Sequence, residues 1–174
     1  MAAIFTVETG TGSATANSYT TEAAADQYHE NYGDPTDWSG ATTTVKENAL
    51  RVATQYMDAR FGTRWLGTKA NETQRLDWPR CGAVVEEYTI DSDVIPEPLQ
   101  DTTAVLALKH VQGTALIPDV TNAGTLSRVR VKVGPIEEEK EYAGSFGETD
   151  QTTFELAERL IASLVWPVGW AVRG

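Results

Sequence analysis

Few side chains in this sequence have the type and spacing that catalysis or metal binding requires. His29 and His110 are the only histidines, and neither has a second ligand at metal-binding spacing. The sequence contains no GxSxG, Walker or HExxH motif. We therefore expect a protein that is not an enzyme, with no catalytic residues, no metal site and no cofactor. His110 is interpreted as a satisfied core or interface histidine.

Two acidic clusters have simpler explanations than ion binding. The first, Asp91-Ser92-Asp93, could hold a divalent cation, but it lies just before a predicted helix, where such side chains cap the backbone. The second, residues 137–139, is a run of three glutamates in a predicted strand, and alternation sends neighbouring strand residues to opposite faces. Neither cluster therefore predicts a site.

Composition limits the remaining possibilities. The chain has 174 residues, which suits one domain, and its charge is −11 because 25 acidic residues face 14 basic ones. An acidic chain gains nothing from counterion release on DNA, so general nucleic-acid affinity is not expected. A single cysteine, Cys81, excludes an intrachain disulfide. We see no signal peptide and no apolar run of the ~20 residues that cross a membrane.

The apolar pattern predicts a mainly α fold, a small bundle of about four helices. Residues 97–114 are apolar around most of a helix, with Pro96 and Pro98 at the start and Gly113 near the end, so they predict the central core helix. Residues 21–32, 45–60 and 153–165 predict its partners. Their expected caps are Thr21 and two capping boxes, Thr44 with Glu47 and Thr152 with Glu155, and Gly62 is expected as the residue just after the second helix.

Residues 127–142 change to a period of two and predict a β-hairpin around Gly134-Pro135. The register places Lys132, Arg130 and Arg128 opposite Glu137, Glu139 and Glu141. On the other face Val133 pairs with Ile136, and Val131 pairs with Glu138. A lone hairpin is marginal in water. We therefore expect a hairpin interface with the helices or with another subunit, formed by Val129, Val131, Val133 and Ile136.

The two ends of the chain carry weaker patterns. Residues 4–7 predict a short strand, and the polar loop at 10–18 is either disordered or pinned against a neighbour. Pro167 breaks the last helix, and the apolar tail 167–174 has no obvious intramolecular place. A frayed terminus is the alternative interpretation of this tail. We predict instead that the tail and the residue before it contact another subunit or a larger partner through Trp166, Trp170, Val172 and Arg173. One domain, 1–174, would thus contain a helical core at about 20–118 and 152–166, the arm at about 127–142 and this tail.

Five segments occur in an order that resembles one known set of proteins. They are ANSYTTEAAADQY at 16–28, ALRVATQYMDARFGTRWLG at 49–67, RLDWPRCG at 75–82, VIPEPLQDTTAVLALKHV at 94–111 and VKVGPIE at 131–137. Together they resemble the head completion proteins of tailed phages, the head–tail adaptors or connectors, a set also labelled DnaT-like single-stranded DNA-binding. The resemblance covers about residues 16–142.

The resemblance implies a homo-oligomeric ring of about twelve copies, joined through head-to-tail contacts. The ring would sit beneath the phage portal protein at the head–tail junction of the virion, after assembly in the host cytoplasm, and receive a downstream tail or stopper protein. DNA would pass through it without specific binding, and an acidic wall suits that passage. No membrane partner is implied.

The alternative is a single-stranded DNA-binding module of the DnaT type. The best surface for it would combine two tryptophans, Trp65 and Trp78, with nearby arginines. Those arginines are Arg51, Arg60, Arg64, Arg75 and Arg80. Tryptophans beside turns more often close the edge of a core, however, and this interpretation is preferred for Trp38, Trp65 and Trp78.

Overall fold

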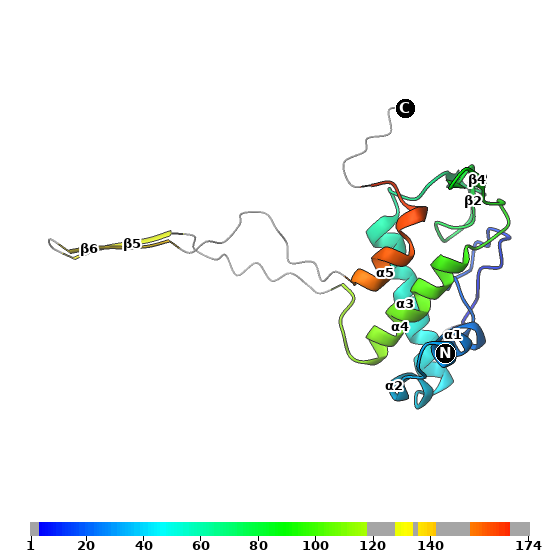
Figure 1. The fold of residues 1–174 in the computed structure, drawn as a ribbon, viewed down its shortest axis with the longest axis horizontal. Helices are drawn as coiled ribbons and strands as arrows, with labels where there is room; N and C mark the ends of the chain where they lie inside the picture. Colours follow the sequence, from blue (N-terminus) through cyan, green and yellow to red (C-terminus); the bar gives the residue numbers. More distant parts are fainter. Residues whose placement is uncertain (1–3, 118–127, 134–135, 142–153, 168–174) are drawn as a thin grey trace. The chain divides into compact units, whose positions relative to one another are not determined.

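The computed structural model describes residues 4–117, 128–133, 136–141 and 154–167, with only the backbone described in the two strands between 128 and 141. The chain divides into a helical unit, Met1–Leu116 with Thr153–Gly174, and a hairpin unit, Ile117–Thr152 (Figure 1). Across the described residues it has five α-helices and three antiparallel strand pairs. The predicted fold class, mainly α with a β-hairpin, is confirmed. None of the described helices is long and apolar enough to cross a bilayer.

The central helix is α4, Glu97–Val111, as predicted. It contacts all four other helices of the unit: α1 (Glu22–Asn31), α2 (Thr36–Ser39), α3 (Thr43–Phe61) and α5 (Glu155–Leu160), most extensively α3 (Figure 1). Leu99 and Leu106 are fully buried. Pro98 occupies the first turn, where its missing N–H costs nothing. Gly113 has φ +83°, which allows Thr114 N to donate to Lys109 O at 3.0 Å and ends the helix.

The predicted caps have mixed outcomes. Thr21 caps α1 as expected, its hydroxyl accepting from Ala24 N at 3.0 Å. The capping box of Thr44 with Glu47 is wrong, because α3 begins earlier, after Thr42, whose side chain makes no capping bond. Gly62 directly follows α3, as expected, and is its C-cap with a right-handed φ of −45° rather than the left-handed φ common at such positions.

The buried face of α3 is not purely apolar. Val45 is 46 % exposed, whereas the adjacent Lys46 is 8 % exposed. The Lys46 ammonium lies 2.8 Å from Asp26 Oδ1 and 5.5 Å from the centre of the Trp38 ring. Trp38 also donates to Asp26 at 2.7 Å. A satisfied cation therefore occupies a place where periodicity alone predicts an aliphatic side chain.

The last helix is shorter than predicted. The expected helix 153–165 is an α-helix only over Glu155–Leu160, followed by a 3-10 turn at Ala162–Leu164. Its predicted capping box is wrong, because Glu155 is the first helical residue; Thr152 lies outside the described residues. After Leu160 the chain leaves α-helical geometry and pairs with the segment after α3. Val165 forms an isolated antiparallel β-bridge with Trp65, and Leu164 O accepts from Leu66 N at 3.0 Å. Tertiary pairing thus shortens the helix.

Residues 62–95 form an irregular segment with two small hairpins that the sequence patterns did not predict. Strand β1 (Thr68–Lys69) pairs with β2 (Arg80–Cys81), and β3 (Val84–Val85) pairs with β4 (Tyr88–Thr89). Trp65 and Trp78 are 2 % and 0 % exposed, and their rings meet edge to face at 6.2 Å. The prediction that tryptophans beside turns close the core is confirmed.

The N-terminal loop is pinned. The expected strand at 4–7 is wrong, since only Val7 pairs, in a single parallel bridge with Ser18. The buried Glu8 carboxylate accepts from Gly10 N, Gly12 N and Ser13 N at 3.0, 3.0 and 2.7 Å. One buried carboxylate thus satisfies three backbone donors of the loop and fixes the turn.

In the hairpin unit, β5 (Arg128–Val133) pairs with β6 (Ile136–Glu141) in the predicted register. The Cα partners include Lys132 with Glu137, Arg130 with Glu139 and Val133 with Ile136. Period-two patterning and the position of Gly134-Pro135 were therefore sufficient to predict the pairing.

Candidate binding surfaces

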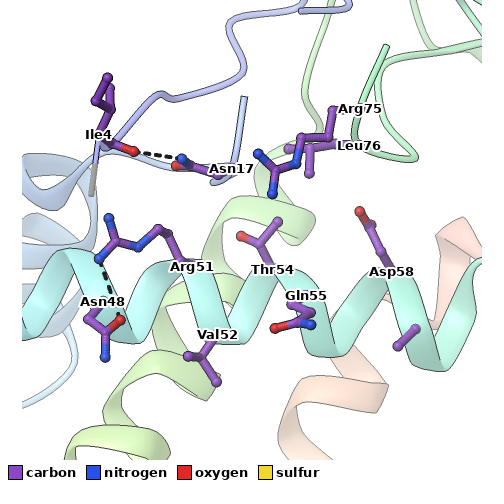
Figure 2. Close-up of a pocket in the computed structure, with 11 residues that line it drawn as sticks. Ile4, Asn17, Asn48, Arg51, Val52, Thr54, Gln55, Asp58, Arg75 and Leu76 are labelled. Atoms are coloured by element: carbon purple, nitrogen blue, oxygen red, sulfur yellow. Dashed lines mark hydrogen bonds between the residues drawn. The ribbon is translucent and has the colours of Figure 1, made fainter. Parts of the chain in front are cut away.

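One face of α3 forms the floor of an open groove with a volume of about 710 Å³ (Figure 2). We call it the Arg51–Arg75 groove. The polar residues of α3 that line it follow helical spacing, and the other walls come from the N-terminal segment and the irregular segment. Its lining residues are Ile4, Asn17, Asn48, Arg51, Val52, Thr54, Gln55, Asp58, Ala59, Arg75 and Leu76.

Two guanidinium groups give the groove its cationic character. Arg51 is on α3, with Nη2 donating to Asn48 Oδ1 at 3.4 Å, and Arg75 lies across the groove from the helix (Figure 2). Asn17 Nδ2 donates to Ile4 O at 2.8 Å, which holds the N-terminal wall together. Apolar atoms of Val52 and Leu76 lie among these polar groups. The groove can therefore pair with anions while covering a small apolar surface.

The carboxyl group of Asp58, at one end of the groove, is only about half ionised at neutral pH. Burial raises the pKa of Asp58 to about 7, although the hydrogen bond from the Tyr19 hydroxyl opposes the shift. The negative charge of Asp77 raises the pKa of Asp58 further. The Tyr19 oxygen in turn accepts from Asp77 N at 3.0 Å and Trp78 N at 3.3 Å.

The base-stacking surface that the DNA-binding alternative required, Trp65 and Trp78 with nearby arginines, is not formed. Trp65 and Trp78 lie in the core, and base stacking requires an accessible ring face. The arginines named with them separate into two groups. Arg60, Arg64 and Arg80 lie away from the groove, engaged with Glu158, Trp166 O and three backbone carbonyls. Arg51, which donates to Asn48, and Arg75 line the groove.

A second surface feature is the tip of the β3–β4 hairpin, Val84–Thr89, which we call the acidic knob. Its turn residues Glu86 and Glu87 have φ of +48° and +71°, a conformation that glycine or asparagine adopts more readily. Non-glycine residues held there cost about 1–3 kcal/mol each and cluster at functional sites. The ring of Tyr88 is 79 % exposed and Val84 is 49 % exposed.

Both features were missed from the sequence. Asn48, Arg51 and Gln55 share the polar face of α3, so helical spacing was an available signal for the groove floor. No sequence signal indicated that Arg75 lies opposite this helix face, because its position depends on an irregular loop. For the knob, the two-residue spacing in VVEEYT is a hairpin signal, but Glu-Glu is not a usual turn pair.

The predicted contact residues at the C-terminus are only partly described. Trp166 is half-buried, and its backbone is fixed by Trp166 N donating to Arg64 O at 2.7 Å and by Arg64 Nη2 donating to Trp166 O at 3.1 Å. Trp170, Val172 and Arg173 lie outside the described residues. The expected tail contact stays a prediction, with its starting point anchored beside α3.

The predicted hairpin interface also stays a prediction. Val129, Val131, Val133 and Ile136 have a described backbone, and their side chains lie outside what the structure describes. Of the two histidines, His29 is the buried one, with Nε2 at 3.2 Å from Ala104 O, whereas His110 is half-buried. Among the described residues no group of three or more His, Cys, Asp or Glu could hold a metal ion.

Comparison with known proteins identifies the family. The family described as "Putative DnaT-like ssDNA binding protein" matches residues 3–174. The chain belongs to this DnaT-like family. No curated protein and no solved structure matches it. The family match extends over both units, and it includes the groove, the knob and the hairpin.

Proposed function

We propose that this DnaT-like protein is a structural component of a phage virion, a head–tail adaptor that forms a ring beneath the portal. The observation that carries the proposal is the insertion of a separate hairpin unit, Ile117–Thr152, between α4 and α5 of the helical unit. A lone two-stranded hairpin is marginally stable in water, so in this proposal the hairpin gains its stability from contacts with a neighbouring subunit or a tail protein.

Charge supports the same function. A ring through which DNA slides should not retain it, and a chain of net charge −11 repels phosphates at long range. In this proposal the ring has about twelve copies, joins the portal to a downstream tail or stopper protein, and lets DNA pass without specific binding.

The test is negative-stain imaging of the purified full chain, alone and mixed with the portal protein of its phage. We expect rings in the mixture, seated on the portal. Val131→Asp should reduce ring incorporation, because it places a charge on the expected hairpin interface. Arg130→Gln changes the net charge by the same amount at the neighbouring position and should leave incorporation intact. A wild-type chain that never associates with the portal would refute the adaptor.

The C-terminal tail gives a second test of the same assembly. In this proposal Trp166 and Trp170 contact another chain, and Arg173 meets an acidic group of a partner. Deletion of residues 168–174 should preserve the helical circular-dichroism signal and reduce incorporation beneath the portal. Unchanged incorporation of the truncated chain would remove the tail from the interface.

The second candidate function is single-stranded DNA binding, favoured by the family description and by the Arg51–Arg75 groove. Its test is a fluorescence titration with oligo-dT at physiological salt. We expect negligible binding because of the acidic charge. Micromolar or tighter affinity that is lost in Arg51→Gln/Arg75→Gln would favour DNA binding over the adaptor.

A further inference from the structure

The acidic knob and the Arg51–Arg75 groove are complementary surfaces on the same helical unit. The knob presents two adjacent carboxylates, Glu86 and Glu87, on a two-residue turn, next to the exposed Tyr88. The groove presents two guanidinium groups beside apolar atoms of Val52 and Leu76. Paired carboxylates match paired guanidinium groups in both charge and hydrogen-bond geometry.

The shapes also agree. The knob is a tight convex hairpin, because a two-residue turn joins two short strands. The groove is concave, and its volume of about 710 Å³ falls within the range of pockets that bury a ligand. A tyrosine beside charged groups is typical of residues that anchor interfaces. No knob residue lines the groove of its own copy.

We propose that the acidic knob of one copy docks into the Arg51–Arg75 groove of the next. Glu86 and Glu87 pair with Arg51 and Arg75, and Tyr88 covers the half-buried Val52. Because the two surfaces differ, the contact is head-to-tail and propagates around a ring. The contact explains why carboxylates stand where glycine or asparagine would fit the backbone more easily. This inference rests on the proposed ring and names the contact that closes it.

Charge exchange tests the contact in the full chain. Arg51→Glu/Arg75→Glu has an acidic knob and an acidic groove, and Glu86→Arg/Glu87→Arg has a basic knob and a basic groove. Each variant alone should repel its own copies and lose rings in sedimentation velocity and negative stain. Mixing the two should restore rings of even copy number, because each knob then meets a groove of opposite charge. The loss should correspond to at least a tenfold weaker association, since paired charges of the same sign replace attractive ones.

Two controls separate docking from folding. Glu30→Arg/Glu155→Arg makes the same charge change at exposed positions outside the knob and should keep the rings. Glu86→Asn/Glu87→Gly relieves the backbone conformation, so it should raise the melting temperature of the monomer while weakening association. If the glutamates had only a structural role, the melting temperature and the strength of association would change in the same direction.

The outcomes distinguish this contact from the adaptor function. Rings that persist in both charge variants overturn the knob-and-groove contact and leave the adaptor intact. Charge-dependent oligomers that never bind the portal support the contact and overturn the adaptor. Oligo-dT binding that depends on Arg51 and Arg75, with no effect of the knob variants, assigns the groove to DNA and overturns the contact. A wild-type chain that stays monomeric at its highest soluble concentration, with and without portal, also overturns it.

Discussion

The helical layer and the irregular segment at 62–95 are held together by different forces. In the layer, α4 lies among four helices and is stabilised by apolar burial shared over many side chains. In the irregular segment, regular pairing is limited to strands of two residues, and single polar side chains satisfy the backbone. The first arrangement distributes its stability, and the second concentrates it in a few residues.

Arg80 shows this concentration best. Its guanidinium group donates to Leu66 O at 2.7 Å, Gly67 O at 2.7 Å and Asp77 O at 3.1 Å. Gln74 does the same on a smaller scale, donating to Leu76 O at 2.9 Å and Pro79 O at 3.1 Å. Backbone carbonyls in this segment thus accept from side chains, and of those named Pro79 O also accepts from a backbone donor, Ala70 N at 3.2 Å. The acidic knob and Arg75 belong to this segment, so binding features and concentrated stability occur together.

The largest expected effect comes from the helical layer. Leu106→Ala should lower the free energy of unfolding by about 2–5 kcal/mol, because it leaves a cavity at the centre of α4. Leu156→Ala, at a residue that is 57 % exposed, is the matched control and should change stability by less than ~0.5 kcal/mol. Urea titration monitored by circular dichroism measures both variants. Equal losses would contradict the idea that burial in α4 organises the layer.

In the irregular segment, Arg80→Ala should cost about 1–3 kcal/mol, since it removes the donor from three partly buried carbonyls. Arg75→Ala removes the same type of side chain from an exposed position of the same segment and should be nearly neutral in the monomer. Arg80→Lys should rescue only part of the loss, because one ammonium group cannot reproduce the planar geometry of a guanidinium. Urea midpoints that agree for Arg80→Ala and Arg75→Ala would show that the carbonyls find other donors.

The same difference explains what the sequence could predict. The centres of four helices, the central position of α4 and the register of β5 with β6 follow from periodicity and turn chemistry, and each was predicted correctly. The ends of α3 and α5 were not, because they depend on tertiary contacts such as the bridge of Trp65 with Val165. Lys46 was not recognised as buried, because the charge of Asp26 that satisfies it comes from another helix.

The groove and the knob were harder to predict for a related reason. A helical face is visible in a sequence, but the groove also requires Arg75 and Asn17 from loops whose positions are set by Gln74, Arg80 and Glu8. Such side-chain-to-backbone bonds leave no periodic signal. The chain carried enough information to predict α3 and too little to predict what lies opposite it.

The pH dependence of stability tests the boundary between the helical layer and the irregular segment, where Asp58 of α3 lies beside Tyr19 and Asp77. The pKa of Asp58 is about 7 in the folded chain, above its ordinary value of 3.8, and the main cause is burial. Between these values only the folded state holds the proton, so the stabilising contribution present at low pH is lost as pH rises through about 7.

Asp58→Asn removes this dependence while keeping an acceptor for the Tyr19 hydroxyl. The stability of the variant relative to the wild type should therefore increase by about 1 kcal/mol between about pH 6 and about pH 8. The difference between the two proteins is the proper measure, because burial also lowers the pKa of His29 and affects both chains equally. A difference that stays constant with pH would place the Asp58 titration outside this range.

The smallest expected effect is at the exposed edge of the helical layer. Arg159 Nη2 and Nε donate to Glu155 Oε1 at 2.7 and 3.1 Å across one turn of α5, yet the two side chains are 76 % and 78 % exposed. Solvent screens such a pair, so Glu155→Ala should cost only about 0.3–0.5 kcal/mol, and less at high salt. A double-mutant cycle with Arg159→Ala separates the pair from the effect of Glu155 on the helix dipole. A coupling above ~1 kcal/mol would mean that the layer, like the irregular segment, relies on individual polar contacts.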